Sequence, residues 1–319
     1  MKALLEQLTF ELKRFDAKEK SIETFFIGGG TPSTVSPELY KPIFDLLKPY
    51  FMDDIEITTE ANPNSATLSW IEGMKNLGVN RISFGVQSFD DKKLKFLNRA
   101  HNSEDAIRAV NDAYHVGIKN ISLDLIYATV LDTKELLEAD LKQAFSLPIN
   151  HLSAYALTIE EGTPFEKTPQ VAREKLSLTN FVFEKIKKQG FTQYEISNFG
   201  TYQSRHNLGY WQYKNYIGVG SGAVGAKDGV RYYPSTDIDF YIQNPLHVRE
   251  EILNEEEQKS EKLFLGLRSV IGVNETILNT DELKRANILL DEEKLTKVGN
   301  RFYNKEYLLS DEIALFILN

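Results

Sequence analysis

The sequence predicts an α/β protein built on a parallel β-sheet, followed by a smaller, mainly helical domain. Between residues 22 and 157, short apolar runs alternate with helical patterns, which is typical of repeated βα units. Beyond residue 165 this alternation stops and a different pattern begins. With 319 residues, of which 42% are hydrophobic, the chain is long enough to bury a sizeable core.

Each predicted strand is a short apolar run, and a predicted helix follows most of them. The strands are expected at residues 22–27, 55–60, 80–86, 120–126 and 151–157. The helices between them are expected at 37–47, 65–77, 103–116 and 133–145. The strand runs are mostly apolar rather than alternating, as expected for strands that are covered on both faces.

The two ends of the chain lie outside this repeat. An amphipathic N-terminal helix is predicted from one apolar face, formed by Leu4, Leu5, Leu8 and Leu12. After the repeat we expect a helix at 171–189, a strand at 191–196 and a loop at 198–229. The tail is predicted to form helices at 260–270, 280–286, 292–297 and 310–318, with a strand at 301–308. The expected domains are therefore residues 1–200, 201–254 and 255–319.

Composition excludes several classes of protein. The formal net charge of −9 argues against a general nucleic-acid binder, which needs a basic surface. The absence of cysteine excludes disulfides and thiolate metal sites within this sequence. No run of about 18 uncharged apolar residues exists, so no integral membrane segment is expected. The N-terminus has acidic residues throughout and does not resemble a signal peptide, so we expect a cytoplasmic location.

Polar residues occur where successive strands end. Gly28, Gly29 and Gly30 follow the first strand, and Glu60 ends the second. Gln87 follows the third strand and Asp124 lies in the fourth. In parallel βα barrels the site lies at the carboxyl ends of the strands. These groups should therefore face one opening, where they could hold a ligand with an amino group, a carboxylate and hydroxyls.

Each feature alone also has a simpler interpretation. Three glycines after a strand often form only a tight turn, and a single strand-end carboxylate is usually solvated. The glycines do not match a phosphate-binding loop, because no Gly-Lys-Ser/Thr follows them. They also lack the Gly-x-Gly-x-x-Gly spacing of dinucleotide-binding folds. The coincidence of polar groups at successive strand ends is what favours a binding site.

Four motifs together resemble the radical S-adenosylmethionine (SAM) proteins related to oxygen-independent coproporphyrinogen III oxidase. They are Gly28-Gly29-Gly30-Thr31-Pro32, Glu60-Ala61-Asn62-Pro63, the segment 83–88 (Ser-Phe-Gly-Val-Gln-Ser) and Asp124-Leu125-Ile126-Tyr127. The resemblance implies a partial barrel of about six βα units, here without its first strand. The pattern of elements in the tail itself indicates a small helical, winged-helix-like C-terminal domain. The resemblance also implies that SAM is bound by Gly29, Gly30, Thr31, Glu60, Gln87, Arg99, Asp124 and Thr158.

The sequence departs from this family in two places. The Cys-x-x-x-Cys-x-x-Cys loop that holds the family's [4Fe–4S] cluster is absent, so no ordinary cluster ligands are present. We therefore do not expect these 319 residues to be catalytic as written. The second departure is the segment 127–132 (Tyr-Ala-Thr-Val-Leu-Asp), where the family usually has Tyr-Gly-Leu-Pro-Gly-Gln. The turn after Asp124 is expected to be remodelled.

The segment around His206 resembles the haem-chaperone branch of this family more than the oxidase. His206, Asn207, Tyr210 and Trp211 form its His-Asn-x-x-Tyr-Trp motif. Imidazole is a common haem ligand, so the resemblance makes His206 the ligand of the haem iron. Gly218, Gly220 and Gly222 are expected to let the backbone approach the ligand. The remaining histidines, His101, His115, His151 and His247, are interpreted as structural.

Three functions remain open from the sequence. The favoured one is a haem carrier that passes haem to a respiratory or membrane-associated apoprotein. The alternative is a radical SAM oxidative decarboxylase of coproporphyrinogen III, whose chemistry requires the missing cluster. The third is an inactive homologue, in which the unpaired edge of the strand at 22–27 is an aggregation liability.

Overall fold

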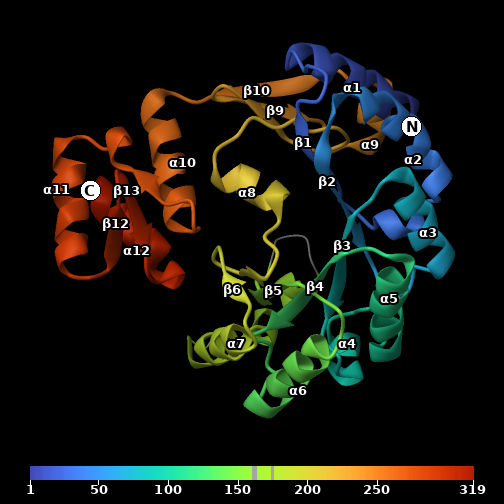
Figure 1. Ribbon diagram of the computed structural model, residues 1–319, viewed down its shortest axis with the longest axis horizontal. Coiled ribbons are helices and arrows are strands. Elements are labelled where there is room, and N and C mark those ends of the chain that lie inside the picture. Colours follow the sequence, from blue (N-terminus) through green and yellow to red (C-terminus); the bar gives the residue numbers. More distant parts are fainter. Residues whose placement is uncertain (160–163, 174–175) are drawn as a thin grey trace. The chain divides into compact units, whose positions relative to one another are not determined.

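The computed structural model describes residues 1–159, 164–173 and 176–319 (Figure 1). The chain forms two compact units. The second unit, Thr24–Lys41 and Ile55–Gln203, contains most of the βα repeat. The first unit comprises Met1–Glu23, Pro42–Asp54 and Ser204–Asn319. It contains the N-terminal helix, the segment with the His-Asn-x-x-Tyr-Trp motif and the tail.

The βα repeat has the predicted order of elements (Figure 1). Its strands are β1 (Ile22–Ile27), β2 (Phe51–Ala61), β3 (Arg81–Gln87), β4 (Asn120–Tyr127), β5 (His151–Ala156), β6 (Thr192–Gln193) and β7 (Asn198–Gly200). Its helices are α2 (Pro37–Leu47), α3 (Leu68–Leu77), α4 (Asp91–Phe96), α5 (Ser103–Val116), α6 (Lys134–Phe145) and α7 (Leu176–Lys188). The predicted helix at 171–189 therefore begins later than expected, and residues 174 and 175 lie outside the described residues.

The strands form one seven-stranded sheet in the order β1-β2-β3-β4-β5-β7-β6. Strands β2 to β5 pair in parallel, which confirms the predicted parallel sheet. Strand β1 lies at one edge of this sheet. At the other edge β7 pairs antiparallel with β5, and β6 pairs antiparallel with β7. The sequence did not predict β7, because its three residues are too few for a detectable pattern.

The central strands alternate in chemistry more than their mostly apolar runs predict, although residues on both faces of β3 and β4 are largely buried, as expected. Ile82, Phe84, Ile121 and Leu123 are fully buried. Their neighbours on the opposite face are polar, and the sheet register sets them side by side: Glu60, Ser83, Ser122 and His151 form one row across β2 to β5. Asp124, Ser153 and Asn198 form the next row. One face of the sheet thus packs as a core, and the other is a polar lining.

A buried hydrogen-bond chain crosses this lining. The Nδ1 atom of His151 lies 2.6 Å from Ser122 Oγ, and its Nε2 atom lies 2.7 Å from Tyr194 Oη. All three residues are at most 1% exposed. Burial lowers the pKa of His151 well below its usual value, and the charge of Arg81 lowers it further. His151 is therefore a neutral residue that joins two strands to the segment before β7, as its structural interpretation predicts.

The turn after β4 contains a residue in an unusual conformation. Ala128 has a φ of +63°, in the left-handed region that favours glycine. Asp132 closes this turn, because its Oδ2 atom accepts a hydrogen bond of 2.7 Å from the Thr129 backbone N–H. The chain keeps a left-handed residue at the position where the resembled family has glycine. The turn is therefore remodelled in its side chains, as expected, while Ala128 retains a glycine-like backbone.

Asp132 also belongs to a buried charge cluster that fastens α4 and α6 to the sheet. Lys93 Nζ lies 2.7 Å from Asp132 Oδ1 and 3.6 Å from Asp140 Oδ2, and the Lys93 and Asp132 side chains are 0% exposed. Asp140 accepts hydrogen bonds from Ser88 Oγ, at 2.7 Å, and from the Phe89 backbone N–H, at 2.7 Å. Removing one charge from such a cluster leaves the others buried without compensation.

The first unit contains the remaining elements (Figure 1). Its helices are α1 (Lys2–Arg14), α8 (Arg205–Trp211), α9 (Ile238–Gln243), α10 (Glu255–Leu267), α11 (Thr280–Asp291) and α12 (Ser310–Leu318). Its strands are β8 (Gly225–Lys227), β9 (Val230–Pro234), β10 (Val248–Ile252), β11 (Val273–Asn274), β12 (Leu295–Val298) and β13 (Arg301–Asn304). They form two three-stranded sheets in the orders β10-β9-β8 and β11-β13-β12.

The tail is a three-helix domain with a small antiparallel sheet. Its core packs α10, α11 and α12 around residues such as Leu263, Leu267 and Phe302. The predicted helix at 292–297 is wrong, because Leu295–Val298 forms β12, which pairs with β13. Gly299, with a φ of +59°, lies in the turn between the two strands. The tail is otherwise mainly helical, as expected, and β13 is the predicted strand, which ends at Asn304 rather than at residue 308.

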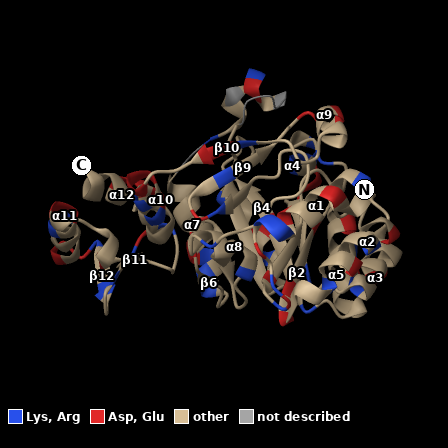
Figure 2. Ribbon diagram, turned by 90° about the horizontal axis from the view of Figure 1, so that it is seen from above, with Lys and Arg blue, Asp and Glu red and all other residues tan. Residues whose placement is uncertain are grey.

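Charged residues of both signs are interspersed along the helices of each unit (Figure 2). Helix α11, for example, carries Asp281 and Glu282 in its first turn and Lys284 one turn later. Among the described residues, no helix is long and apolar enough to cross a membrane.

Candidate functional site

The glycine triplet lies directly after β1 and adopts conformations that other residues rarely take. Gly29 and Gly30 have φ values of +79° and +58°, and nothing lies within 4 Å of where a Cβ would stand on either. A Cβ on Gly28 would lie 2.4 Å from Phe26 Cε1 and 3.2 Å from Glu60 Cδ. The triplet therefore combines a tight turn with open space beside bare backbone. Glycine suits these positions because it adopts positive φ angles without steric cost.

Three ionisable side chains interact next to this turn. Burial raises the pKa of Glu60, and the charge of Asp124 raises it further, while the Gly29 backbone N–H lowers it. Burial also raises the pKa of Asp124, against hydrogen bonds from Ser153 and Ser83. Burial lowers the pKa of Arg99, and the Asp124 carboxylate opposes this change. Asp124 thus interacts with both Glu60 and Arg99, and Glu60 also interacts with the Gly29 backbone.

Gln87 and Thr158 lie differently from this group. Gln87 is buried, with a φ of +68°, at a break in the pairing of β3 with β4. Its side chain turns back over Gly85, since a Cβ on Gly85 would lie 3.1 Å from Gln87 Nε2. Thr158 is exposed, and its hydroxyl donates a weak hydrogen bond of 3.4 Å to the Ala156 carbonyl. Thr31 is half-buried, and its carbonyl accepts a 3.0 Å hydrogen bond from the Thr34 N–H.

Sequence reasoning missed a second set of polar groups on the same lining. Glu195 is only 2% exposed, and its Oε1 atom accepts a hydrogen bond of 3.0 Å from the Ser197 N–H. Burial raises the pKa of Glu195 to about 7. Tyr155 lies within electrostatic range of both Glu195 and Asp124 and is hydrogen-bonded by Ser153 and Asn198. The alternation of His151, Ser153 and Tyr155 along β5 is the signal that could have revealed this polar face.

The polar lining suits a small molecule that carries both charges. Arg99 offers a cation whose Nε atom is buried with no hydrogen-bond partner among the described residues. Glu60 and Asp124 offer carboxylates, and Gly29 and Gly30 offer accessible backbone. The chain does not suit an iron–sulfur cluster, because its sequence contains no cysteine. No cluster of three or more His, Cys, Asp or Glu side chains able to hold a metal occurs in the described parts of the chain.

The His-Asn-x-x-Tyr-Trp motif lies on α8, so the prediction of a loop at 198–229 is wrong for this segment. Ser204 begins the helix, and its Oγ atom accepts a hydrogen bond of 3.3 Å from the Asn207 N–H. His206 and Tyr210 are one turn apart on one face. Their rings meet edge to face at 4.9 Å, and His206 Nε2 lies 3.1 Å from Tyr210 Oη. Tyr210 also meets Tyr216 edge to face at 4.7 Å.

Asn207 and Trp211 lie on a neighbouring face of α8, because they too are four residues apart. Trp211 is half-buried, and its Nε1 atom has no hydrogen-bond partner within the described chain. It lines a cavity that His206 and Tyr210 do not line. The structure therefore places the four motif residues on two adjacent faces rather than around one cavity.

The glycines after α8 serve the packing of the chain itself. A Cβ on Gly218 would lie 2.2 Å from the Val224 carbonyl oxygen. The Gly220 N–H donates a hydrogen bond of 2.9 Å to Gln7 Oε1 on α1. Gly222 has a φ of +72°. For Gly218 the expectation of a close approach to a ligand is wrong, because its own backbone occupies that space.

Comparison with known proteins identifies the family of this chain. Residues 3–143 match the model of the radical SAM superfamily. The chain is 36% identical to "Heme chaperone HemW" of Bacillus subtilis over 80% of its length, and 31% identical to that of Lactococcus lactis over 85%. It is 39% identical to that of Escherichia coli over 66% of its length. The matched regions span 72%, 75% and 57% of these three relatives.

The fold has a known counterpart. A solved structure of coproporphyrinogen III oxidase (HemN) from Escherichia coli, only 18% identical, superposes with a TM-score of 0.81. The superposition covers 99% of this chain and 82% of that one. This likeness shows that the two proteins share a fold, with the partial barrel and the C-terminal domain in one chain. From the sequence matches, the chain belongs to the HemW family of the radical SAM superfamily.

Proposed function

We propose that this protein binds haem through His206 and passes it to a haem-accepting protein. The observation that carries the proposal is the position of His206 on a helix face, half-buried and beside the aromatic rings of Tyr210 and Tyr216. An imidazole supplies a ligand for the haem iron, and aromatic rings supply flat apolar surface against the porphyrin. The names of the HemW relatives support the same function.

Tyr210 is a weaker candidate for the iron ligand than His206. A tyrosine binds haem iron as the phenolate, and burial raises the pKa of Tyr210 above its usual value, with a further rise from Tyr216. The Tyr210 hydroxyl therefore stays protonated at neutral pH. It remains a hydrogen-bond partner of His206 Nε2, which iron binding at that nitrogen would displace.

A haemin titration followed at the Soret band tests this proposal. We expect saturable binding at one equivalent to the wild-type chain and loss of that binding in His206→Ala. His115→Ala is the matched control, because His115 is exposed on α5 and has no role in the proposal. Unchanged binding by His206→Ala would reject His206 as the ligand. Transfer is then measured by mixing the loaded protein with an apo-haemoprotein and following the shift of the Soret band.

We also propose that the polar lining of the second unit binds SAM. Glu60, Arg99 and Asp124 would hold the charged methionine end, and Gly29 and Gly30 would let the backbone approach it. In its family SAM is the source of a carbon-centred radical when an iron–sulfur cluster reduces it. Since this sequence has no thiolate, its own residues support binding and orientation of SAM but no radical step. Isothermal titration with SAM against Glu60→Gln tests the binding, which we expect the variant to weaken.

The proposed acceptor is a respiratory or membrane-associated haem protein. A carrier must release its cargo, so moderate haem affinity suits the role better than a closed pocket. The edge-to-face stack of His206, Tyr210 and Tyr216 leaves Tyr210 39% exposed, which supports an accessible rather than enclosed haem. An oxidative decarboxylase remains the alternative, but its cluster has no ligands in this sequence.

A further inference from the structure

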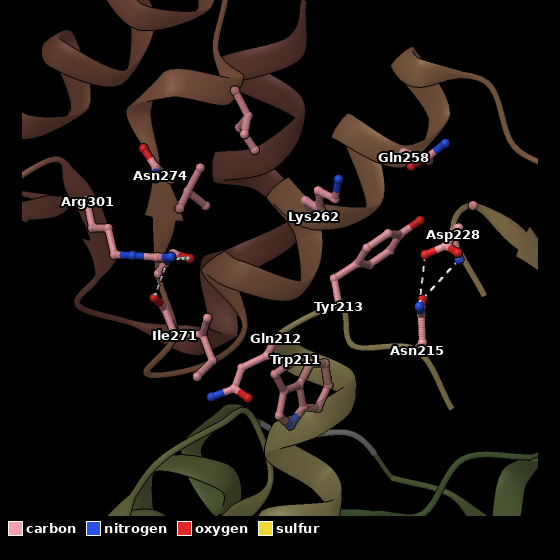
Figure 3. A pocket seen from close by; sticks show the side chains of 14 residues that line it. Trp211, Gln212, Tyr213, Asn215, Asp228, Gln258, Lys262, Ile271, Asn274 and Arg301 are labelled. Carbon is pink, nitrogen blue, oxygen red and sulfur yellow. Dashed lines mark hydrogen bonds between the residues drawn. The ribbon is translucent and has the colours of Figure 1, made fainter. Parts of the chain in front are cut away.

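A cavity of about 410 Å³ lies inside the first unit, between the end of α8 and helix α10 of the tail (Figure 3). We call it the α8–α10 cavity. Its walls include Trp211, Tyr213, Asp228, Lys262, Ile271 and Arg301. Its volume falls in the range of small-molecule sites, roughly 300–1,000 Å³. Trp211 belongs to the His-Asn-x-x-Tyr-Trp motif, whereas the other residues of the lining lie outside that motif.

One side of the cavity is aromatic and apolar. The indole of Trp211 and the phenol ring of Tyr213 stand beside it, and Ile271 faces it from the tail (Figure 3). The ring of Tyr213 is fixed, because its hydroxyl donates a hydrogen bond of 2.7 Å to Glu261 Oε2. Tyr213 also has a φ of +59°, so the backbone holds it in an uncommon conformation. These fixed flat faces suit a flat apolar ligand.

Two cations line the cavity without a carboxylate partner. Lys262 Nζ lies 5.0 Å from the centre of the Tyr213 ring, and within the described ranges no acidic group is in ion-pair distance of it. Arg301 Nη1 donates to the backbone carbonyls of Ile271, at 3.0 Å, and Gly272, at 3.3 Å, and no described carboxylate forms an ion pair with it. Asp228, the acidic residue in the lining, is hydrogen-bonded to Asn215 instead.

Most other basic residues of the tail pair with carboxylates, whereas Arg285 donates to the backbone carbonyls of Ile317 and Leu318 and Lys305 is exposed. Lys259 bridges Glu256 and Glu282, at 2.5 Å and 2.8 Å, and Arg268 pairs with Asp311 at 2.7 Å. In a chain with a net charge of −9, cations without a carboxylate partner beside an aromatic wall indicate a ligand that brings its own anions. A planar apolar molecule with carboxylates at one edge could contact the aromatic side chains and pair its carboxylates with the two cations. Haem, with its two propionates, has this chemistry.

We propose that the α8–α10 cavity binds the propionate edge of haem, with Lys262 and Arg301 pairing the carboxylates and Trp211 and Tyr213 contacting the ring. This inference rests on the proposed haem-binding function and adds the part of the site that recognises the porphyrin rather than its iron. His206 lies five residues before Trp211, so the two side chains leave α8 about 140° apart. The iron ligand and the ring contact of Trp211 therefore come from different faces of one short helix, whereas the carboxylate contacts come from α10 and β13.

The test compares two ligands and three variants of the full chain. The ligands are haemin and haemin dimethyl ester, in which both propionates are neutral. The variants are Lys262→Gln, Arg301→Gln and the matched control Lys305→Gln, which removes the same charge from an exposed position outside the cavity. We expect Lys262→Gln and Arg301→Gln each to weaken haemin binding about 5- to 20-fold, as for charge-assisted hydrogen bonds. Neither should weaken binding of the ester, and Lys305→Gln should weaken neither ligand.

Metal-free protoporphyrin IX separates this inference from the role of His206. It keeps both propionates but offers no iron to an imidazole. We expect it to bind His206→Ala as it binds the wild type, and to bind Lys262→Gln more weakly, as measured by porphyrin fluorescence. If haemin binds with dependence on His206 while esterification and both cavity variants change nothing, the cavity inference alone is overturned. If the wild type binds no haemin, both proposals are overturned.

Discussion

The contact between His206 and Tyr210 predicts the effect of Tyr210→Phe on haem binding. In the structure His206 Nε2 lies 3.1 Å from the Tyr210 hydroxyl. If the iron binds at Nε2, this hydrogen bond must break first. The phenylalanine keeps the edge-to-face ring contact at 4.9 Å and removes only the competing hydroxyl. Haem binding should therefore become tighter, not weaker.

The size of the effect follows from the hydrogen bond that is lost. A protein hydrogen bond contributes a net roughly 0.5–1.5 kcal/mol. Since about 1.4 kcal/mol corresponds to tenfold in affinity, Tyr210→Phe should lower the dissociation constant of haem about two- to tenfold. The assay is a Soret titration of both proteins under identical conditions. Tyr232→Phe is the control, because no described residue forms a hydrogen bond with its hydroxyl, and it should leave the affinity unchanged.

Weaker haem binding by Tyr210→Phe would refute the reasoning. That result would mean that the Tyr210 hydroxyl contributes to the bound state. It could do so by holding the imidazole through Nε2 while the iron binds the other ring nitrogen. An unchanged affinity would show that the hydrogen bond is not broken on binding. The sign of the change thus identifies which imidazole nitrogen binds the iron.

Three further predictions follow. Lys93→Met should lower the free energy of unfolding, measured by urea denaturation, by about 3–5 kcal/mol, because it leaves Asp132 and Asp140 buried without a cation. The exposed control Lys92→Met should change that free energy little, and equal effects of the two variants would contradict the role of the cluster. The pKa of Glu195 is raised to about 7, so the folded state binds a proton at this carboxyl more tightly than the unfolded state does. The free energy of unfolding should therefore fall by about 3 kcal/mol as the pH rises from 4.5 through 7, and Glu195→Gln should abolish that fall. After incubation with iron, sulfide, dithionite and SAM, chromatography should detect no 5′-deoxyadenosine, since the sequence has no thiolate ligands; its appearance would disprove this.

Much of the repeat could be predicted because its signals are local. Strand β1 and helices α2 and α5 have the predicted bounds, since the apolar pattern of the sequence itself marks them. Strands β6 and β7 could not be found this way. Each has two or three residues, and their pairing with β5 depends on contacts distant in sequence. Residues 292–297 were predicted as a helix, but Leu295–Val298 forms β12, because pairing with β13 outweighs the local helical preference.

The candidate sites show a similar division. Glu60, Arg99 and Asp124 were named from the family resemblance, and in the structure Asp124 lies within electrostatic range of both Glu60 and Arg99. Lys262 and Arg301 carried no sequence signal, because an unpaired cation is recognisable only when its neighbours are known. The role of Gly218 was misjudged for the same reason. Its need for glycine comes from the Val224 carbonyl, which the chain returns to that position.

The two faces of the parallel strands have opposite chemistry, and this has a consequence for insertions. Phe84 and Leu123 lie on the fully buried apolar face, whereas Ser83 and Asp124 lie on the polar one. Inserting one residue within such a strand would exchange the two faces beyond that point, moving carboxylates into the core and leucines into the lining. Inserting two would restore each side chain to its own face. The strands should therefore tolerate the insertion of two residues far better than the insertion of one. The helices need not show this dependence on an even number, because their side chains do not alternate between two faces.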